Sequence, residues 1–148
     1  MTRNQERRFR LFLDANVLVS AAWKLGSRVL RLWQIQNVEL VTSDYVVDES
    51  RRNLPAKDQQ DRLTQLLEQV RVARFSRLPV LEHAPADLPA KDQPVLAAAV
   101  LLRADFLVTG DLQHFGKWYG KDVFGIGIEP PRSFPEILNT APLRRPAH

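Results

Sequence analysis

The chain has 148 residues, of which 45% are hydrophobic and 26% are charged, with a net charge of +4 at pH 7. This length and composition predict a single globular domain with a substantial core. Cysteine is absent, which excludes disulfides, cysteine-based zinc sites and thiol nucleophiles. The excess of arginine and lysine permits a polyanionic partner such as nucleic acid without establishing one.

The first residues of the chain resemble a secretion signal, because several arginines precede an apolar run. Asp14 and Asn16 interrupt that run, so we expect no signal peptide and a cytoplasmic location. The longest apolar run, residues 95–102, is much too short to cross a bilayer, so no membrane association is expected.

Short apolar strands alternate with helical patterns, which predicts an α/β fold with a central parallel sheet covered by helices on both faces. The folded domain is expected over residues 10–138, between a flexible N-terminus (1–9) and a flexible tail (139–148). The expected strands are 10–13, 38–42, part of 71–80, 105–111 and 125–128. The expected helices are 17–22, 27–36, 44–54, 58–70, 91–103, 112–115 and 133–138, with Ser27, Ser43 and Ser133 as caps.

Two of the predicted strands end in a carboxylate. Asp14 follows strand 10–13, and Asp111 closes strand 105–111 after Gly110, which permits a tight turn. Ligands of open α/β sheets bind at the carboxyl ends of the strands. An Asp at such a position also serves as a helix cap or closes a turn, so for Asp14 a capping role and a metal-binding role both stand.

Two further acids lie on apolar faces of predicted helices. Glu49 shares a helix face with Val46, although a lone Glu is more often a surface residue or a salt-bridge partner. Asp92 begins the alanine-rich helix 91–103 and shares a face with Val95. It is a good N-cap as well as a candidate ligand, and the two roles are compatible.

The helices that follow parallel strands begin near the carboxyl ends of those strands, so all four acids are expected at one crevice. Clustered carboxylates repel one another unless a cation lies between them. Mg²⁺ takes oxygen ligands and keeps several waters. A cation held there would favour hydrolysis of a phosphodiester by an activated water, without a protein nucleophile.

The sequence also resembles the PIN-domain family. The segment Leu-Phe-Leu-Asp14-Ala-Asn16-Val-Leu-Val-Ser-Ala is similar to the opening motif of that family, and Glu49 matches the family's second acid. The segments that resemble those of the third and fourth acids are Lys-Asp92-Gln-Pro-Val-Leu-Ala-Ala-Ala and Leu-Val-Thr109-Gly-Asp111. The order and spacing agree across residues 10 to about 138, including the closing segment Gly-Ile-Glu-Pro-Pro-Arg-Ser-Phe-Pro-Glu-Ile-Leu.

This resemblance implies a PIN-like three-layer α/β sandwich and a ribonuclease that uses Mg²⁺ or Mn²⁺. It implies that the catalytic, metal-binding residues are Asp14, Glu49, Asp92 and Asp111, supported by Asn16 and Thr109. Among PIN proteins the chain looks like the VapC-like toxins of toxin–antitoxin pairs. That type implies an RNA substrate and a small antitoxin partner, and it leaves a homodimer open.

One departure from the family pattern concerns the residues after the fourth acid. Many members have another acid there, whereas this chain has Gln113 and His114. His114 could contact the metal or a phosphate, but a solvated or capping role is the more common one for such a histidine. The number of metal ions is therefore open.

Functions other than a nuclease fit the sequence less well. A catalytically silent PIN-type module that binds RNA or protein is the main alternative, although such modules usually lack some of the acids. An aspartyl phosphatase, a phospho-receiver, a P-loop protein and a serine hydrolase each require a pattern that is missing here. The expected RNA-binding residues are Arg51, Arg52 and Lys91, with Arg71 and Arg74 as further candidates.

Overall fold

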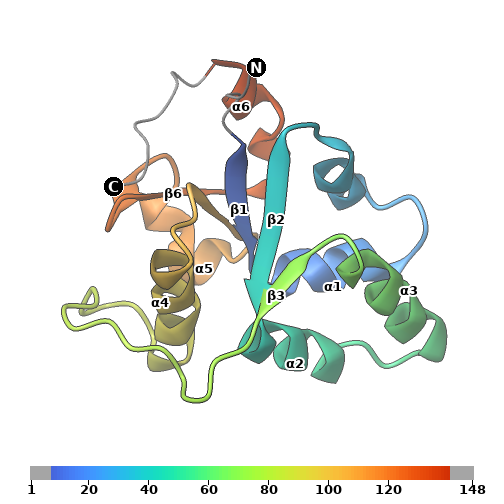
Figure 1. Cartoon of the computed structure of the whole chain (residues 1–148), viewed down its shortest axis with the longest axis horizontal. Coiled ribbons are helices and arrows are strands. Elements are labelled where there is room, and N and C mark those ends of the chain that lie inside the picture. Colours follow the sequence, from blue (N-terminus) through green and yellow to red (C-terminus); the bar gives the residue numbers. More distant parts are fainter. Residues whose placement is uncertain (1–7, 141–148) are drawn as a thin grey trace, which may run out of the picture.

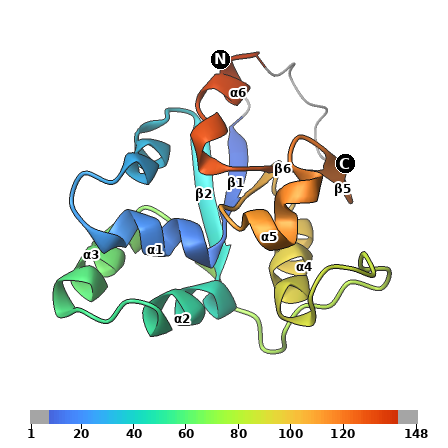
Figure 2. The same cartoon turned by 180° about the vertical axis from the view of Figure 1, so that it is seen from behind.

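The computed structural model describes residues 8–140, and they form a six-stranded sheet with helices on both faces (Figure 1). In both views α1, α2 and α3 lie on one side of β1 and β2, while α4 and α5 lie on the other (Figure 2). The α/β sandwich predicted from the sequence is therefore confirmed. The predicted flexible segments fall mostly on residues 1–7 and 141–148, which lie outside the described residues.

The strand order is β3-β2-β1-β4-β6-β5, and the strands are β1 (Phe9–Leu13), β2 (Val38–Ser43), β3 (Arg71–Ala73), β4 (Phe106–Val108), β5 (Asp122–Val123) and β6 (Ile126–Glu129). All neighbouring pairs are parallel except β5 and β6, which are antiparallel. The central strands are parallel, as predicted, and the antiparallel pair lies at one edge of the sheet. A chain reversal at Phe124 and Gly125, both with positive φ, turns β5 back onto β6 as a short hairpin.

The α-helices are α1 (Ala15–Trp23), α2 (Asp44–Arg52), α3 (Lys57–Leu67), α4 (Gln93–Leu101), α5 (Leu112–Phe115) and α6 (Glu136–Thr140). Short 3₁₀ helices are η1 (Arg28–Gln34), η2 (Ala90–Asp92), η3 (Gly116–Trp118) and η4 (Pro131–Ser133). Among the described residues, no helix combines the length and apolar character that a bilayer crossing requires.

Two predicted helices differ from the observed ones. The amphipathic pattern after Ser27 forms the 3₁₀ helix η1, although Ser27 does cap it by accepting a hydrogen bond from the Val29 N–H. Ser133 does not cap the last helix, because it belongs to η4 and α6 begins only at Glu136, after Pro135. The sequence periodicity identified helical segments here but not their type or starting residue.

The sheet is central because its middle strands are apolar on both faces. Residues 11–13 of β1 and 106–108 of β4 are buried throughout, as expected for strands covered on two sides. The alanines 97–99 of α4 are fully buried and let this helix approach the sheet closely. From β1 the chain proceeds through β2 to β3 and then crosses to β4 on the other side of β1. The strand order therefore reverses at β1, and a crevice is expected at the carboxyl end of this strand.

Candidate active site

Asp14 lies at the carboxyl end of β1 and is 5% exposed. The parallel pairing of β1 with β4 continues to this residue, because its N–H donates to the carbonyl oxygen of Val108 (3.0 Å). The segment that follows β4, with Thr109 and Asp111, is thereby placed beside the segment that follows β1. The strand register alone accounts for the proximity of the first and fourth acids.

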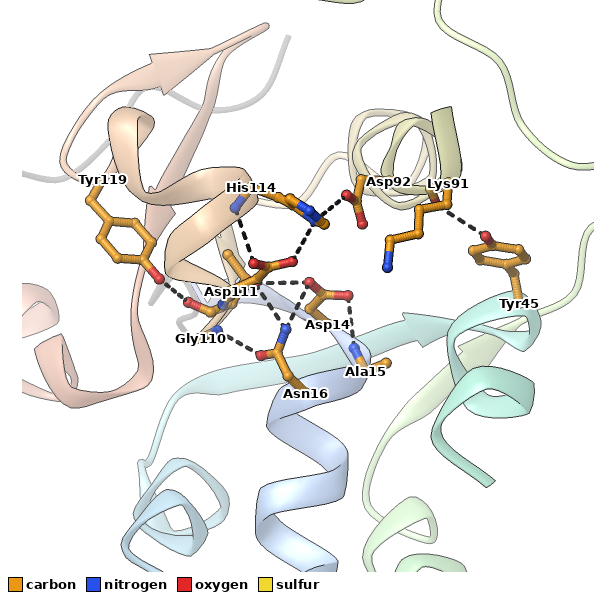
Figure 3. A network of polar contacts seen from close by, with 11 residues as sticks. Asp14, Ala15, Asn16, Tyr45, Lys91, Asp92, Gly110, Asp111, His114 and Tyr119 are labelled. Carbon is orange, nitrogen blue, oxygen red and sulfur yellow. Dashed lines mark hydrogen bonds and ion pairs between the residues drawn. The ribbon is translucent and has the colours of Figure 1, made fainter. Parts of the chain in front are cut away.

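Both oxygens of the Asp14 carboxylate accept hydrogen bonds (Figure 3). Oδ1 accepts from the N–H of Ala15 (2.8 Å), while Oδ2 accepts from the hydroxyl of Thr109 (2.8 Å) and from the amide of Asn16 (3.3 Å). Asp14 therefore contributes to the start of α1 and also presents its remaining lone pairs to the crevice. The local role and the candidate ligand role coexist.

Asn16 and Thr109 tie the two chain segments together around this carboxylate. The Asn16 side-chain oxygen accepts from the N–H of Gly110 (2.6 Å), and the Thr109 hydroxyl accepts from the N–H of Asp111 (3.1 Å). A Cβ at Gly110 would lie 3.3 Å from Asn16 Oδ1, so glycine allows this close approach. The hydroxyl of Tyr119, which the sequence did not single out, holds the carbonyl oxygen of Thr109 (2.8 Å).

A pocket of about 470 Å³ opens above Asp14. It brings together the four acids predicted from the sequence, with Asn16 and Lys91 at its wall; the lining residues are Asp14, Ala15, Asn16, Val19, Glu49, Asn53, Lys91, Asp92 and Asp111. Glu49 reaches it from α2, where its neighbours Val46 and Ser50 are buried beneath it.

Asp92 stands in the N-cap position of α4, yet its side chain makes no capping hydrogen bond. Pro94 occupies the first turn of that helix and has no N–H to donate. The carboxylate turns instead toward α5, so the predicted capping role is wrong. Asp92 is 8% exposed, and its Oδ2 atom is buried without a hydrogen-bond partner among the described residues.

His114 lies between two of the acids, contrary to the expected solvated or capping role. Its Nδ1 atom is 2.8 Å from Oδ2 of Asp92 and 2.9 Å from Oδ2 of Asp111. Within the described residues, one ligand atom from each of these three side chains lies within 4.8 Å of the others. The signal in the sequence was the spacing of three residues, which places His114 in the first turn of α5 beside Asp111, the N-cap of that helix.

The charges of the pocket act on one another. Burial raises the pKa of Asp14 from 3.8 to about 6, against the hydrogen bonds of Thr109 and Ala15, and the charges of Asp92 and Glu49 add to the increase. Burial also raises the pKa of Asp92; the charges of His114 and Lys91 oppose this increase, and that of Asp111 adds to it. This excess of negative charge suits a bound divalent cation.

Of the predicted RNA-binding residues, only Lys91 lines the pocket. Arg51 donates to side-chain oxygens of Gln60 (2.9 Å) and Thr64 (3.1 Å) and so joins α2 to α3. Arg71 pairs with Glu39 (3.5 Å) on the outer part of the sheet. The guanidinium of Arg51 and that of Arg71 are thus engaged in the fold itself.

Comparison with known proteins agrees with this arrangement. The family model described as PIN domain matches residues 10–113, which include all four acids. The chain belongs to the PIN domain family. The match ends one residue before His114, so the histidine that joins two of the acids lies just outside the matched segment.

A solved structure shares the PIN fold. It is the crystal structure of VapBC2 from Rickettsia felis bound to a DNA fragment from their promoter, in which one chain matches with a TM-score of 0.59 and 16% sequence identity. The match covers 82% of this chain and 98% of that chain. A comparison with curated proteins gives no match.

The raised pKa of Asp14 predicts how the stability of the metal-free PIN domain depends on pH. A buried acid whose pKa is raised stabilises the folded state at low pH, and that contribution is lost as the pH rises through about 6. A rise from 3.8 to about 6 corresponds to about 3 kcal/mol at pH 7. Asp14→Asn removes this titration.

We therefore expect the free energy of unfolding of Asp14→Asn, relative to that of the native chain, to increase between pH 4 and pH 7.5 by up to about 3 kcal/mol. Urea unfolding of both proteins in the presence of a chelator measures this difference. A constant difference across that pH range would contradict the raised pKa.

Proposed function

We propose that this protein is a metal-dependent endoribonuclease that hydrolyses RNA phosphodiester bonds. The observation that supports the proposal most strongly is the convergence of Asp14, Glu49, Asp92 and Asp111 on one pocket at the carboxyl end of β1. Carboxylate oxygens are the ligands that Mg²⁺ and Mn²⁺ prefer. A nucleophilic cysteine is excluded by the sequence, which agrees with attack by water.

The four acids would hold the divalent ion, which when bound lowers the pKa of a coordinated water and polarises a phosphodiester. Asn16 and Thr109 fix the orientation of Asp14 through the bonds described above, so the carboxylate needs no rearrangement when the substrate arrives. Glu49 completes the acidic lining from a separate helix, α2.

Lys91 is the cation that the pocket offers to RNA. Its side chain lines the pocket together with that of Asp92, while its backbone carbonyl accepts a hydrogen bond from the hydroxyl of Tyr45 (2.9 Å; Figure 3). We infer that Lys91 contacts the phosphate next to the cleaved bond. Arg52 and Arg74, which are exposed, are retained as weaker candidates for the flanking backbone.

We further propose that the protein is the toxin of a toxin–antitoxin pair in the cytoplasm, with a small antitoxin as its partner. The similarity of fold to a chain of VapBC2 supports this proposal, as does membership of the PIN domain family.

The nuclease proposal predicts the behaviour of Asp14→Asn. Cleavage of a fluorescent single-stranded RNA in the presence of Mn²⁺ or Mg²⁺ should fall by more than about 100-fold, because the best-oriented ligand loses its charge. Asp48→Asn is the matched control, since Asp48 is exposed on α2 beside Glu49 and does not line the pocket. Cleavage that persists in Asp14→Asn, or in excess chelator, would refute the proposal.

The role of Lys91 predicts a change in salt dependence. In Lys91→Gln one contact to the single-stranded backbone is lost. The negative slope of log affinity against log salt should therefore become less steep by about 0.7. Lys24→Gln, at the far end of α1, should retain the slope of the native chain. Binding is measured by fluorescence anisotropy on a non-cleavable RNA. An unchanged slope in Lys91→Gln would remove Lys91 from the interface.

The toxin proposal predicts that induced expression arrests bacterial growth and that Asp14→Asn abolishes the arrest. Co-expression of a small protein encoded by the neighbouring upstream reading frame should restore growth, and the two proteins should purify together. Normal growth at an expression level that gives measurable RNA cleavage would instead indicate a housekeeping nuclease.

A further inference from the structure

Beside the acidic pocket, an imidazole nitrogen lies against two of the pocket's carboxylates. Asp92, Asp111 and His114 meet where the start of α4 faces α5 (Figure 3). We propose that Asp92 Oδ2, Asp111 Oδ2 and His114 Nδ1 form a mixed oxygen–nitrogen metal subsite, and that His114 makes the protein select Mn²⁺ over Mg²⁺. This inference rests on the proposed metal-dependent function and adds a ligand that the four acids do not include.

The separations of the three atoms suit a common ion. Ligand atoms about 2.1 Å from one ion and at right angles to each other lie about 3 Å apart. His114 Nδ1 is 2.8 Å from the Asp92 oxygen and 2.9 Å from the Asp111 oxygen, which are the separations of neighbouring ligands in an octahedral shell.

The contacts themselves are not satisfied hydrogen bonds. Among the described residues, Nδ1 of His114 and Oδ2 of Asp92 are both buried and lack a partner with hydrogen-bond geometry. Buried polar atoms without a satisfied hydrogen bond are costly, and a cation coordinated by both atoms would satisfy them at once. The buried Asp92 directs this oxygen toward the imidazole nitrogen.

The surrounding structure fixes two of the three ligands. Asp111 uses its other oxygen to accept a hydrogen bond from the backbone N–H of His114 (3.0 Å), so only Oδ2 is left to face the imidazole. His114 is anchored in the same short turn, three residues along the chain. Asp111 and His114 therefore form a preset pair, which Asp92 approaches from α4.

The nitrogen donor determines which metal the subsite prefers. Mg²⁺ favours oxygen ligands and water. Transition-metal ions accept an imidazole nitrogen more readily than Mg²⁺ does, and their affinity for such a ligand rises from Mn²⁺ to Co²⁺. Asp14 and Glu49 offer oxygen alone, so they do not discriminate between Mg²⁺ and Mn²⁺ in this way. The preference is expected to come from the side of the pocket where His114 lies against Asp92 and Asp111.

Metal binding without RNA tests this inference. In the native chain, electron spin-echo spectroscopy of bound Mn²⁺ should show modulation from a coordinated imidazole nitrogen, and the affinity for Mn²⁺ should exceed that for Mg²⁺. In His114→Gln the nitrogen modulation should disappear and Mn²⁺ should bind at least about tenfold more weakly, while the affinity for Mg²⁺ remains nearly unchanged. His83→Gln, on an exposed loop, is the matched control and should behave as the native chain.

A second variant guards against loss of folding in His114→Gln. His114→Glu replaces the nitrogen by an oxygen donor, so it should bind Mg²⁺ more tightly than the native chain does, without nitrogen modulation. Circular dichroism of the metal-free variants checks that each is folded.

Two results would overturn the inference: Mn²⁺ that binds to the native chain without nitrogen modulation, or His114→Gln that binds Mn²⁺ as tightly as the native chain or more so. The second would mean that His114 serves as a positive counter-charge to the acids. Either result, together with intact RNA cleavage, leaves the nuclease proposal standing. Conversely, nitrogen modulation without RNA cleavage refutes the nuclease and supports the subsite.

Discussion

The interaction on which the rest of the site depends is the burial of Asp14 among other carboxylates. A buried charge is expensive, and the neighbouring charges of Asp92 and Glu49 increase that cost, as the raised pKa of Asp14 records. Hydrogen bonds from the hydroxyl of Thr109 and the N–H of Ala15 stabilise the carboxylate. These bonds orient the group without neutralising it, so the pocket remains an attractor for cations.

The sheet topology makes this concentration of charge unavoidable. β1 pairs with β4 in parallel register, so the residues that follow both strands emerge at the same edge. The helices α2 and α4 contact each other and α4 contacts β2, which brings Glu49 and Asp92 to that edge from either side. No long-range rearrangement is needed to assemble the four acids, because the order of the strands does so.

Much of the fold and of the acidic pocket could be predicted from the sequence. The features that could not be predicted all depend on contacts between segments that are distant in the chain. Asp14 and Asp111 were predictable because each follows a short apolar strand, and Glu49 because it follows a buried neighbour on its helix face. The orientation of Asp92 was not, since capping is a local preference and the turn at Pro94 removes the N–H that would support it. The position of His114 between two acids depends on how α5 faces α4, which no local pattern encodes. The same holds for Arg51, whose contacts with α3 decide that it does not reach the pocket.

The unfavourable free energy of the site comes from repulsion between carboxylates and not from strained backbone dihedral angles. Residues other than glycine with positive φ, namely Asn37, Arg103 and Phe124, all lie outside the acidic pocket. Strained backbone is one way in which functional sites hold free energy, but within residues 8–140 the unfavourable feature at this pocket is like charge at close range. Such a cost can be relieved reversibly by a cation, whereas strained dihedral angles persist whatever binds. The pocket is therefore rigid in its framework, through Asn16, Thr109 and Gly110, and responsive in its charge. That combination allows a preformed geometry whose stability depends on what occupies it.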